Sequence, residues 1–390
     1  MRVINIIMSV YNGERFLEEQ IESIMGSTYS NFRLFIFDDC STDSSFEIAQ
    51  KYAKRYRHRV FACRNEENMG STVSFLSNLK KISDKINSVK ESEIANSYVG
   101  KSGWLRRFRN RNRKNNSLKD KAFSLTTKAI TSIKNGAVYL KGKAAGLAGL
   151  NGQNDSNVKK NPKRKIHEYY MFCDQDDIWL RDKLSVTLKK LVGVERRHGK
   201  HKHAMVYTDA ILVDEKLNYL SRSFYKTNHM KGKKADLGKV LMENRSIGCT
   251  CMFNQALCDL VGNDYTGIRY HDWWIALIGV AFGNIRFLKT PTVMYRQHSA
   301  NQVGQKKFKD YIASRLGDMK DNRRRLEETR VQAESFYHEY HGLLKKKQGK
   351  ILRAFINLDV TTPLMRRITI VRYGFFKSGV IRNIGLLLTI

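Results

Sequence analysis

Apolar runs alternate with helical patterns over the first 80 residues of the chain. Val3–Val10, Phe32–Phe37 and Val60–Cys63 are apolar runs of strand length, as expected for strands of a parallel sheet that is covered on both faces. Segments 15–25 and 46–55 between them carry apolar residues at helical spacing. This β-α-β-α-β order predicts an α/β fold with a parallel, doubly wound sheet, whose ligand crevice lies at the carboxyl ends of the strands.

A further apolar run, Tyr169–Cys173, ends in three carboxylates within four residues: Asp174, Asp176 and Asp177. Carboxylates this close repel one another. A divalent cation relieves the repulsion, because hard cations such as Mg²⁺ and Mn²⁺ take carboxylate oxygens as ligands and add positive charge. We therefore expect a buried strand that delivers this cluster to a metal–phosphate site.

Polar residues also follow the first two predicted strands. Asn12 comes after the first strand and Asp39 after the second, as Asp174 comes after the central one. Because the carboxyl ends of parallel strands meet at one edge of a sheet, these three polar clusters are expected to converge.

The rest of the pattern predicts a mixture of strands and helices. The expected elements are a helix opening at 71–79, a helix opening at 179–184 and running to about 196, strands at 204–210, 211–213 and 247–253, helices at 237–242, 254–261 and 271–282, and paired short strands at 285–288 and 293–296. From residue 308 the chain reads as helical and charged, with a long amphipathic candidate at 318–340.

The formal net charge of +33 over 390 residues indicates an anionic partner. Much of this charge lies at about residues 83–165, which we interpret as an exposed insertion, partly disordered or loosely helical. Three interpretations remain open: a solvated loop, a surface for anionic lipid head groups that uses Trp104, Leu105 and Phe108, or a nucleic-acid site. The last is the weakest, since no DNA- or RNA-binding motif accompanies the charge.

Residues 351–390 alternate apolar side chains with Arg and Lys, in apolar runs too short to span a bilayer. Such helices suit the membrane interface, or packing on the preceding domain, and the two are compatible. We expect no signal peptide, because a predicted strand begins directly at the start of the sequence, and no membrane span, because no apolar run reaches about 18 residues. The six cysteines form no Cys-x-x-Cys pair, which predicts reduced thiols in a cytoplasmic protein.

Taken together, six motifs resemble those of family 2 glycosyltransferases with the GT-A fold. They are Ser9–Gly13, Asp38–Asp43, Asn65–Gly70, Phe172–Trp179, His271–Trp274 and Tyr295–His298. The resemblance is strongest to rhamnosyltransferase-type members that build O-antigen, capsule or other bacterial surface polysaccharide. It covers roughly residues 1–82 and 166–305, whereas the basic insertion departs from the usual pattern, in which this loop is much shorter.

The resemblance implies an α/β fold of GT-A type: a Rossmann-like, mixed, mainly parallel sheet flanked by helices. The glycosyltransferase domain would span residues 1–305, interrupted by the insertion at about 83–165. A helical, membrane-associating region would follow at 306–390.

The resemblance also implies roles for individual residues. The nucleotide-sugar donor would be bound by Val10, Tyr11, Asn12, Glu14, Asp39, Asn68, Asp174 and Gln175. The metal ligands would be Asp176 and His298, with a structural role as the alternative for the histidine. The base of an inverting transfer would be Asp272, with a helix N-cap as its alternative. Contacts to the acceptor or sugar would come from Asp177, Trp179 and His271, with orientation of the turn as the alternative for Asp177 and packing as the alternative for Trp179.

The predicted reaction moves a sugar, with rhamnose from dTDP-rhamnose as first choice, to a hydroxyl of a lipid-linked saccharide. It requires Mg²⁺ or Mn²⁺ and takes place on the inner face of the cell membrane, against an anionic lipid surface and without nucleic acid. A UDP-hexose or UDP-N-acetylhexosamine donor is the alternative within the same fold.

Two other classes compete with this prediction. A sugar-phosphate nucleotidyltransferase would need a glycine-rich phosphate loop, whereas residues 9–13 contain a single glycine. A basic module that binds nucleic acid or membrane without catalysis would account for the charge but not for the acidic cluster.

Overall fold

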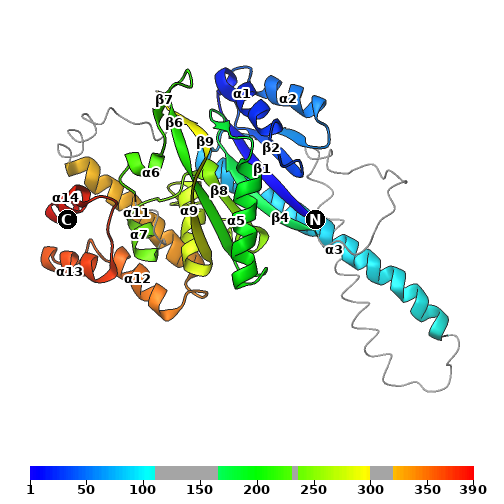
Figure 1. The fold of residues 1–390 in the computed structure, drawn as a ribbon. Helices are drawn as coiled ribbons and strands as arrows, with labels where there is room; N and C mark the ends of the chain where they lie inside the picture. The colour runs from blue at the N-terminus through cyan, green and yellow to red at the C-terminus, as the bar shows by residue number, and fades with distance from the viewer. Residues whose placement is uncertain (110–165, 231–235, 299–318) are drawn as a thin grey trace. The chain divides into compact units, whose positions relative to one another are not determined.

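The computed structural model describes residues 1–109, 166–230, 236–298 and 319–390 (Figure 1). The chain divides into two units, residues 1–80 with 163–390 and residues 81–162. The first unit contains the sheet and all the predicted site residues. We describe its two parts in turn.

The N-terminal part of the sheet follows the predicted alternation. Its elements are β1 (Arg2–Val10), α1 (Glu14–Met25), β2 (Phe32–Asp38), α2 (Ser45–Arg55), β3 (Val60–Arg64) and, after the insertion, β4 (His167–Cys173). β1 pairs in parallel with β2 and with β4, and β2 pairs in parallel with β3. The carboxyl ends of β1, β2 and β4 therefore lie side by side, as the sequence predicts.

The C-terminal part of the sheet introduces antiparallel pairs. Its strands are β5 (Ile178–Trp179), β6 (Ala204–Val213), β7 (Tyr219–Ser221), β8 (Cys251–Asn254) and β9 (Asn284–Arg296). The described strands form one sheet in the order β3-β2-β1-β4-β8-β6-β9-β5, with β7 paired to β6. β8 runs antiparallel between β4 and β6, while β6 and β9 are parallel.

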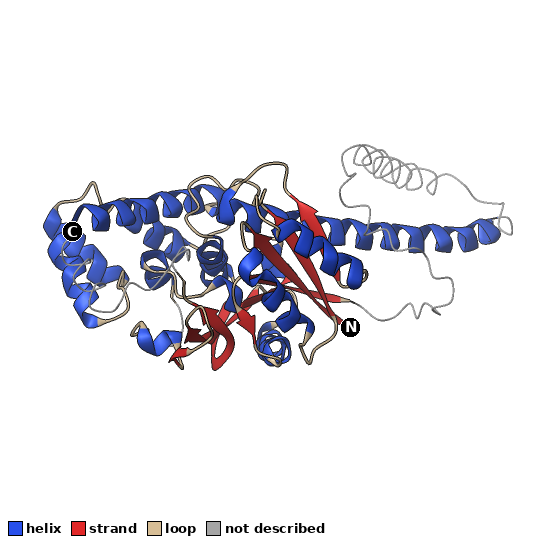
Figure 2. Cartoon of the chain, turned by 90° about the horizontal axis from the view of Figure 1, so that it is seen from above, coloured by secondary structure: helices blue, strands red, loops and turns tan. Residues whose placement is uncertain are grey.

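Helices lie on both sides of this sheet (Figure 2). They are α5 (Lys183–His198), α6 (Phe224–Thr227), α7 (Leu237–Met242), α8 (Gln255–Cys258) and α9 (His271–Phe282), followed by α11 (Met319–Tyr340), α12 (Lys346–Ile356), α13 (Pro363–Tyr373) and α14 (Val380–Thr389). The predicted mixed α/β sheet flanked by helices is confirmed. Its core contains fully buried aliphatic side chains from strands and helices alike, such as Ile6, Leu17 and Leu191.

Three predictions for local structure are wrong. The helix predicted to open at Trp179 begins at Lys183, because Ile178 and Trp179 pair with β9 as the short strand β5. The two strand pairs expected at 204–213 and 285–296 are single strands, β6 and β9, which pair with each other in parallel through register shifts around Asp209. The strand expected at 247–253 begins only at Cys251, because Gly248–Thr250 form a 3₁₀ turn, η3.

The third predicted helix, α3 (Gly70–Arg109), runs past the expected insertion boundary at about residue 83. The side chains of Trp104, Leu105 and Phe108, and the whole of residues 110–165, lie outside what the structure describes. The interpretation of the insertion therefore remains a prediction.

The C-terminal helices pack on the sheet domain, as one of the two sequence interpretations expected. Phe336 and Tyr340 of α11 contact Trp274 of α9, with ring centroids 5.2 and 5.9 Å apart. Phe355 of α12 meets Phe375, which follows α13, at 5.0 Å. Across the described residues, every helix is too short or too polar to cross a membrane. The six cysteines are free thiols, as predicted.

Candidate active site

The loops after β1 and β2 are joined by backbone and side-chain hydrogen bonds. The Asp39 amide donates to the Val10 carbonyl at 2.7 Å. Asn12 adopts a positive φ of 48°, and its side-chain oxygen accepts from the Thr42 amide at 2.9 Å. The Asn12 amide in turn donates to Ser41 Oγ at 3.0 Å. These contacts hold the first two strand ends as one surface.

Gln175 connects the end of β4 to the same surface. Its side-chain oxygen accepts from the Tyr11 amide at 2.7 Å, and its side-chain nitrogen donates to the Tyr11 carbonyl at 3.0 Å. A Cβ on Gly13 would lie 2.5 Å from the Gln175 amide carbon, so a larger residue there would displace the Gln175 side chain from Tyr11. The Tyr11 ring is 49% exposed, which leaves its face accessible to a planar ligand.

Asp39 is buried in a polar network at the end of β2. Its Oδ1 accepts from Asn65 Nδ2 at 2.7 Å and from the Met69 amide at 3.2 Å. Asn65 also donates to Ser74 Oγ, which accepts from Ser9 Oγ at 2.8 Å. A carboxylate held this way keeps a fixed orientation, as selective binding of a nucleobase or sugar would need.

Two other predicted donor-site residues lie at exposed helix starts. Glu14 accepts from the Ser44 amide, at the start of α2, with Oε2 at 2.9 Å. Asn68 Oδ1 accepts from the Gly70 amide, at the start of α3, at 3.1 Å. Each therefore has a local structural role beside the binding role that the sequence suggests.

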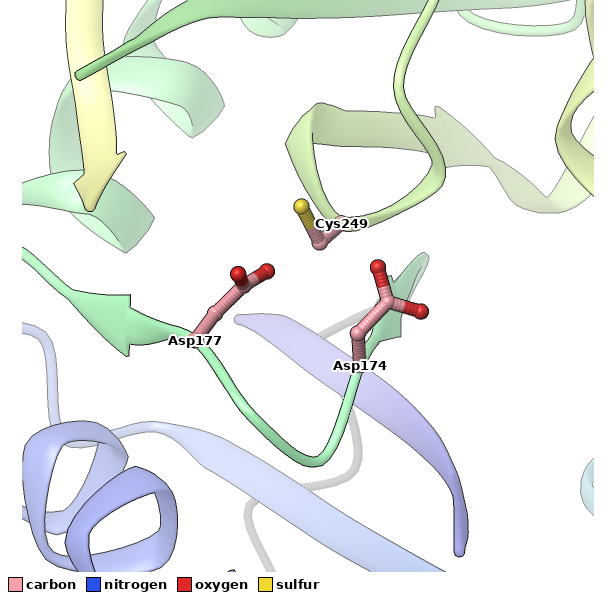
Figure 3. A group of neighbouring side chains, drawn as sticks. All are labelled: Asp174, Asp177 and Cys249. Carbon is pink, nitrogen blue, oxygen red and sulfur yellow. The ribbon is translucent and has the colours of Figure 1, made fainter. Parts of the chain in front are cut away.

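The acidic cluster lies in the turn between β4 and β5 and faces η3. Ligand atoms of Asp174, Asp177 and Cys249 lie within 4.8 Å of one another (Figure 3). Asp177 is fully buried. Its Oδ1 accepts from the Arg296 amide at 3.2 Å, whereas its Oδ2 has no hydrogen-bond partner among the described residues. A buried carboxylate oxygen without a hydrogen bond lowers the stability of the fold, and a bound cation would supply the missing partner.

Burial and mutual repulsion change the acidity of the cluster. Burial, with the charges of Asp176 and Asp272 adding to it, raises the pKa of Asp174 to about 7. Burial and the charges of Asp176 and Asp174 raise the pKa of Asp177 well above its ordinary value. The fold thus holds these carboxylates close together although their charges repel one another, which is typical of a functional site.

Asp176 and His298 come together as the sequence predicts, since His298 Nε2 lies 2.7 Å from Asp176 Oδ2. Arg296, at the end of β9, holds the turn that carries Asp176. Its side chain is only 2% exposed, and its Nε donates to the Asp176 carbonyl at 2.8 Å. Its Nη2 pairs with Glu19 of α1 at 2.5 Å. Arg296 lies within one of the six motifs, but no feature of the sequence indicates its role.

Lys183 is a second residue that sequence reasoning missed. It is fully buried at the start of α5, where Nζ donates to Thr292 Oγ1 at 3.1 Å and lies 4.7 Å from the centre of the Trp179 ring. Burial lowers the pKa of Lys183, and the neighbouring Cys249 and Asp177 oppose that change. Trp179 is 2% exposed, so its ring packs under the cluster.

Asp272 lies in the first turn of α9. Its Oδ1 accepts from the Trp273 amide at 2.7 Å. Burial raises the pKa of Asp272 to about 6, and hydrogen bonds from Asn244, Trp273 and Gly248 act in the opposite direction. The alternative that Asp272 is the N-cap is wrong, because the N-cap residue of α9 is Tyr270. Its charge also acts on Asp174, which places the two carboxylates in one site.

His271 is buried beside Asp272. Its ring stacks on Phe75 with centroids 4.1 Å apart and meets Phe172 edge-on at 4.8 Å. Burial lowers its pKa to about 3, so the imidazole is neutral. Its Nε2 lies 2.8 Å from the position of a Cβ on Gly248, so a larger residue at that position would push against the packed imidazole.

Comparison with known proteins adds a family assignment for part of this site. Residues 5–86 match the family model "Glycosyl transferase family 2". These residues are therefore similar to a family 2 glycosyl transferase domain. The matched segment contains Val10, Tyr11, Asn12 and Asp39, and it ends before the acidic cluster.

The relatives differ in how much of the chain they match and in how similar they are to it. The chain is 43% identical to the putative glycosyltransferase EpsE of Bacillus subtilis over 65 residues, 17% of this chain and 23% of that protein. It is 20% identical to the dTDP-rhamnosyl transferase RfbG of Shigella flexneri over 336 residues, 83% of each chain. The chain thus spans about a quarter of the length of EpsE. A mannosyltransferase structure from Pyrobaculum calidifontis, in complex with GDP-Man and Mn²⁺, is 14% identical over 99% of this chain and 78% of its own, at a TM-score of 0.47. Similarity at that level does not establish function.

Proposed function

We propose that this protein is a metal-dependent, inverting glycosyltransferase whose catalytic domain is residues 1–305. The observation that carries the proposal is the convergence at one sheet edge of Asp39, the Asp174–Asp177 cluster and Asp272, next to a family 2 glycosyl transferase segment. The elevated pKa values of Asp174 and Asp272 support chemistry at this edge, since structure alone does not call for partly buried carboxylates that repel one another.

The donor would bind over the ends of β1, β2 and β4. Tyr11 offers an exposed ring for the base, and Asp39 an oriented carboxylate acceptor. Val10, Asn12, Glu14 and Asn68 shape the loops around them. Asp174 and Gln175 follow at the end of β4, where the ribose and pyrophosphate would lie. The Gln175 amide is committed to the Tyr11 backbone, so we assign it the role of holding the pocket wall.

The cluster fits a hard divalent cation. Asp177 Oδ2 is buried without a partner among the described residues, and the cluster combines three carboxylates. We assign Asp176 as the direct ligand and His298 as a second ligand or pyrophosphate contact, because carboxylate oxygen and imidazole nitrogen both suit Mn²⁺. When bound, Mg²⁺ or Mn²⁺ neutralises the charge that develops on the leaving pyrophosphate. Arg296 holds the backbone of Asp176 in position.

Asp272 would take the proton from the acceptor hydroxyl. A general base works best when its pKa lies near the operating pH, and the pKa of Asp272 is raised to about 6. The carboxylate is then ionised at pH 7 and still basic. Its position in the first turn of α9, with a hydrogen bond to the Trp273 amide, fixes its direction. His271 packs against Phe75 and Phe172, and the Trp179 ring lies against Lys183, so we assign both residues supporting roles.

For the donor we propose dTDP-rhamnose, supported by the similarity over most of both chains to a protein named as a dTDP-rhamnosyl transferase. UDP-hexose and UDP-N-acetylhexosamine are the alternatives. For the acceptor we propose a hydroxyl of a lipid-linked saccharide in surface polysaccharide synthesis, with Asp177 near it. The enzyme would then work as a peripheral protein on the cytoplasmic face of the membrane.

The test is a screen of the purified protein, with Mg²⁺ or Mn²⁺, against a panel of nucleotide sugars, following nucleotide release. Metal-dependent release from one donor class is the expected result. Absence of release and of nucleotide-sugar binding across the panel would contradict the proposal, and a basic module that binds nucleic acid or membrane would then replace it.

A further inference from the structure

The helices α13 and α14 each have a buried apolar face and an exposed apolar face. Ile370 of α13 and Leu386 of α14 form the buried face and are 0% and 6% exposed, and Phe375, in the connection between the helices, is 0% exposed. The exposed face contains Leu364 (68%), Met365 (49%), Ile368 (46%) and Val371 (60%) on α13, and Val380 (77%), Ile384 (54%) and Leu388 (75%) on α14. We call this second set the outer face. Its members recur three or four residues apart, so each helix presents one apolar stripe.

Hydrogen bonds and an ion pair fix α13 and α14 to each other and to the residue after α7, so the position of the outer face is fixed. Arg367 Nε of α13 donates to the Leu387 carbonyl of α14 at 2.9 Å. Glu243, directly after α7, accepts from the Ser378 amide at 2.8 Å and pairs with Arg382 at 2.5 Å. With the inner face committed to these contacts, the outer stripes lack a partner within the part of the chain that the structure describes.

The segment that carries the outer face is strongly basic. Residues 341–390 contain ten Lys and Arg side chains and a single acidic residue, Asp359. That carboxylate lies 3.5 Å from Arg330. Exposed basic residues follow on α12, as Lys346, Lys347 and Arg353, and on α13, as Arg372. An apolar surface with this charge matches a partner that is apolar inside and anionic at its edge.

We propose that the outer face of α13 and α14 docks on the surface of an anionic lipid bilayer. Helices of 11 and 10 residues lie in the membrane interface with their apolar stripe among the acyl chains and their basic residues at the head groups. A second copy of the chain fits less well, because two faces with the same positive surroundings repel. The lipid surface alone offers both the apolar interior and the opposite charge.

The docking surface connects to the candidate base through α7. Glu243 holds α14, and its neighbour Asn244 hydrogen-bonds to Asp272. Trp273, next to Asp272, donates its indole N–H to the Val240 carbonyl of α7 at 2.5 Å. Docking would thereby fix the membrane relative to the site at which a lipid-linked acceptor is used. The docking inference itself does not rest on the proposed reaction, because lipid binding is measurable without a donor.

The experiment is vesicle flotation of the full-length protein with phosphatidylglycerol–phosphatidylcholine vesicles and with pure phosphatidylcholine vesicles. The test variant is Leu364→Ser with Val371→Ser, two outer-face residues that are 68% and 60% exposed. The matched control is Tyr219→Ser with Leu220→Ser on β7, which are 58% and 56% exposed. Thermal melting of all three proteins verifies that the substitutions leave the fold intact.

We expect binding to the anionic vesicles that weakens with salt and falls about tenfold or more in the test variant, since about 25 cal/mol is lost per Å² of apolar surface. The control variant binds like the wild type. Three results would overturn the inference: equal anionic binding by the test variant and the wild type, equal binding to neutral and anionic vesicles, or concentration-dependent self-association without vesicle binding. Nucleotide release without vesicles, measured on the same proteins, separates a failure of docking from a failure of the proposed reaction.

Discussion

At the ends of β1, β2 and β4 carboxylates are buried, whereas on α13 and α14 leucine, isoleucine and valine side chains face solvent. Asp177 is 0% exposed and Leu364 is 68% exposed, the reverse of what each side chain prefers. In both regions surrounding contacts hold the unfavourable arrangement: Arg296 and η3 around the carboxylates, and Arg367 and Glu243 behind the helices. The two regions differ in what would relieve them, a cation in the first and a lipid surface in the second.

Among the changes that test the two regions, removal of the metal should have the largest effect. Chelation, or Asp176→Asn, should lower nucleotide release at least about 100-fold, because the leaving pyrophosphate loses its neutralising charge. Asp259→Asn is the control, since Asp259 is an exposed carboxylate directly after α8 that accepts a hydrogen bond from Gln255. Added Mn²⁺ should restore the chelated wild type. Chelated protein that works at the untreated rate would show that the buried cluster serves another purpose.

The stability of the protein should depend on the charge of Asp174. The folded pKa of about 7 lies above the ordinary value of 3.8. Ionisation of Asp174 in the folded state therefore lowers the free energy of unfolding. This loss is absent below about pH 4, grows as the pH rises, and is complete above about pH 7. Asp174→Asn should raise the free energy of unfolding at pH 8 by roughly 2–4 kcal/mol and leave it nearly unchanged at pH 4. Urea unfolding at the two pH values measures this, and an equal effect at both would refute the electrostatic explanation.

Arg296→Lys should weaken the scaffold under the cluster. Lysine loses the donors to the Asp176 and Glu215 carbonyls, at a cost of about 1–3 kcal/mol in unfolding free energy. Arg15→Lys is the matched control, because the Arg15 side chain is 64% exposed in its pair with Glu215 and such pairs contribute at most about 1 kcal/mol. Equal losses in the two variants would mean that Arg296 does not hold the turn.

The smallest effect on stability is expected on the outer face. Leu364→Ser should change the free energy of unfolding by less than about 0.5 kcal/mol, since the side chain is 68% exposed. Ile370→Ala, on the same helix but fully buried, should cost about 2–5 kcal/mol. Chemical denaturation compares the two. A large loss from Leu364→Ser would indicate that the outer face is already packed against protein.

The sequence was most informative where structure depends on neighbours in the chain. The apolar runs at β1, β2 and β4 predicted both the strands and their convergence, because strand period and strand ends are local features. β5 could not be predicted, since a two-residue strand exists only through its pairing with Met294 and Val293. β6 and β9 are likewise continuous because they pair with each other along their length. The register shifts in this pairing are not indicated by any local pattern.

The same limit applies to the site. Asp174, Asp176 and Asp272 stand out in the sequence, because acidic residues at the ends of apolar elements need an explanation. Arg296 does not, because its contacts join residues 81 to 277 positions away, such as Glu215 and Glu19. Lys183 and Cys249 are also visible only in three dimensions, since no local pattern indicates that a lysine is fully buried or that a cysteine faces two carboxylates.

The central claim is that the buried carboxylates perform sugar transfer with Asp272 as the base. The most direct measurement compares wild type and Asp272→Asn at saturating donor, following both donor binding and transfer to acceptor. We expect donor affinity within about threefold of wild type and transfer slower by about 10²–10⁴, the usual contribution of a general base. Transfer by Asp272→Asn at close to the wild-type rate would contradict the account.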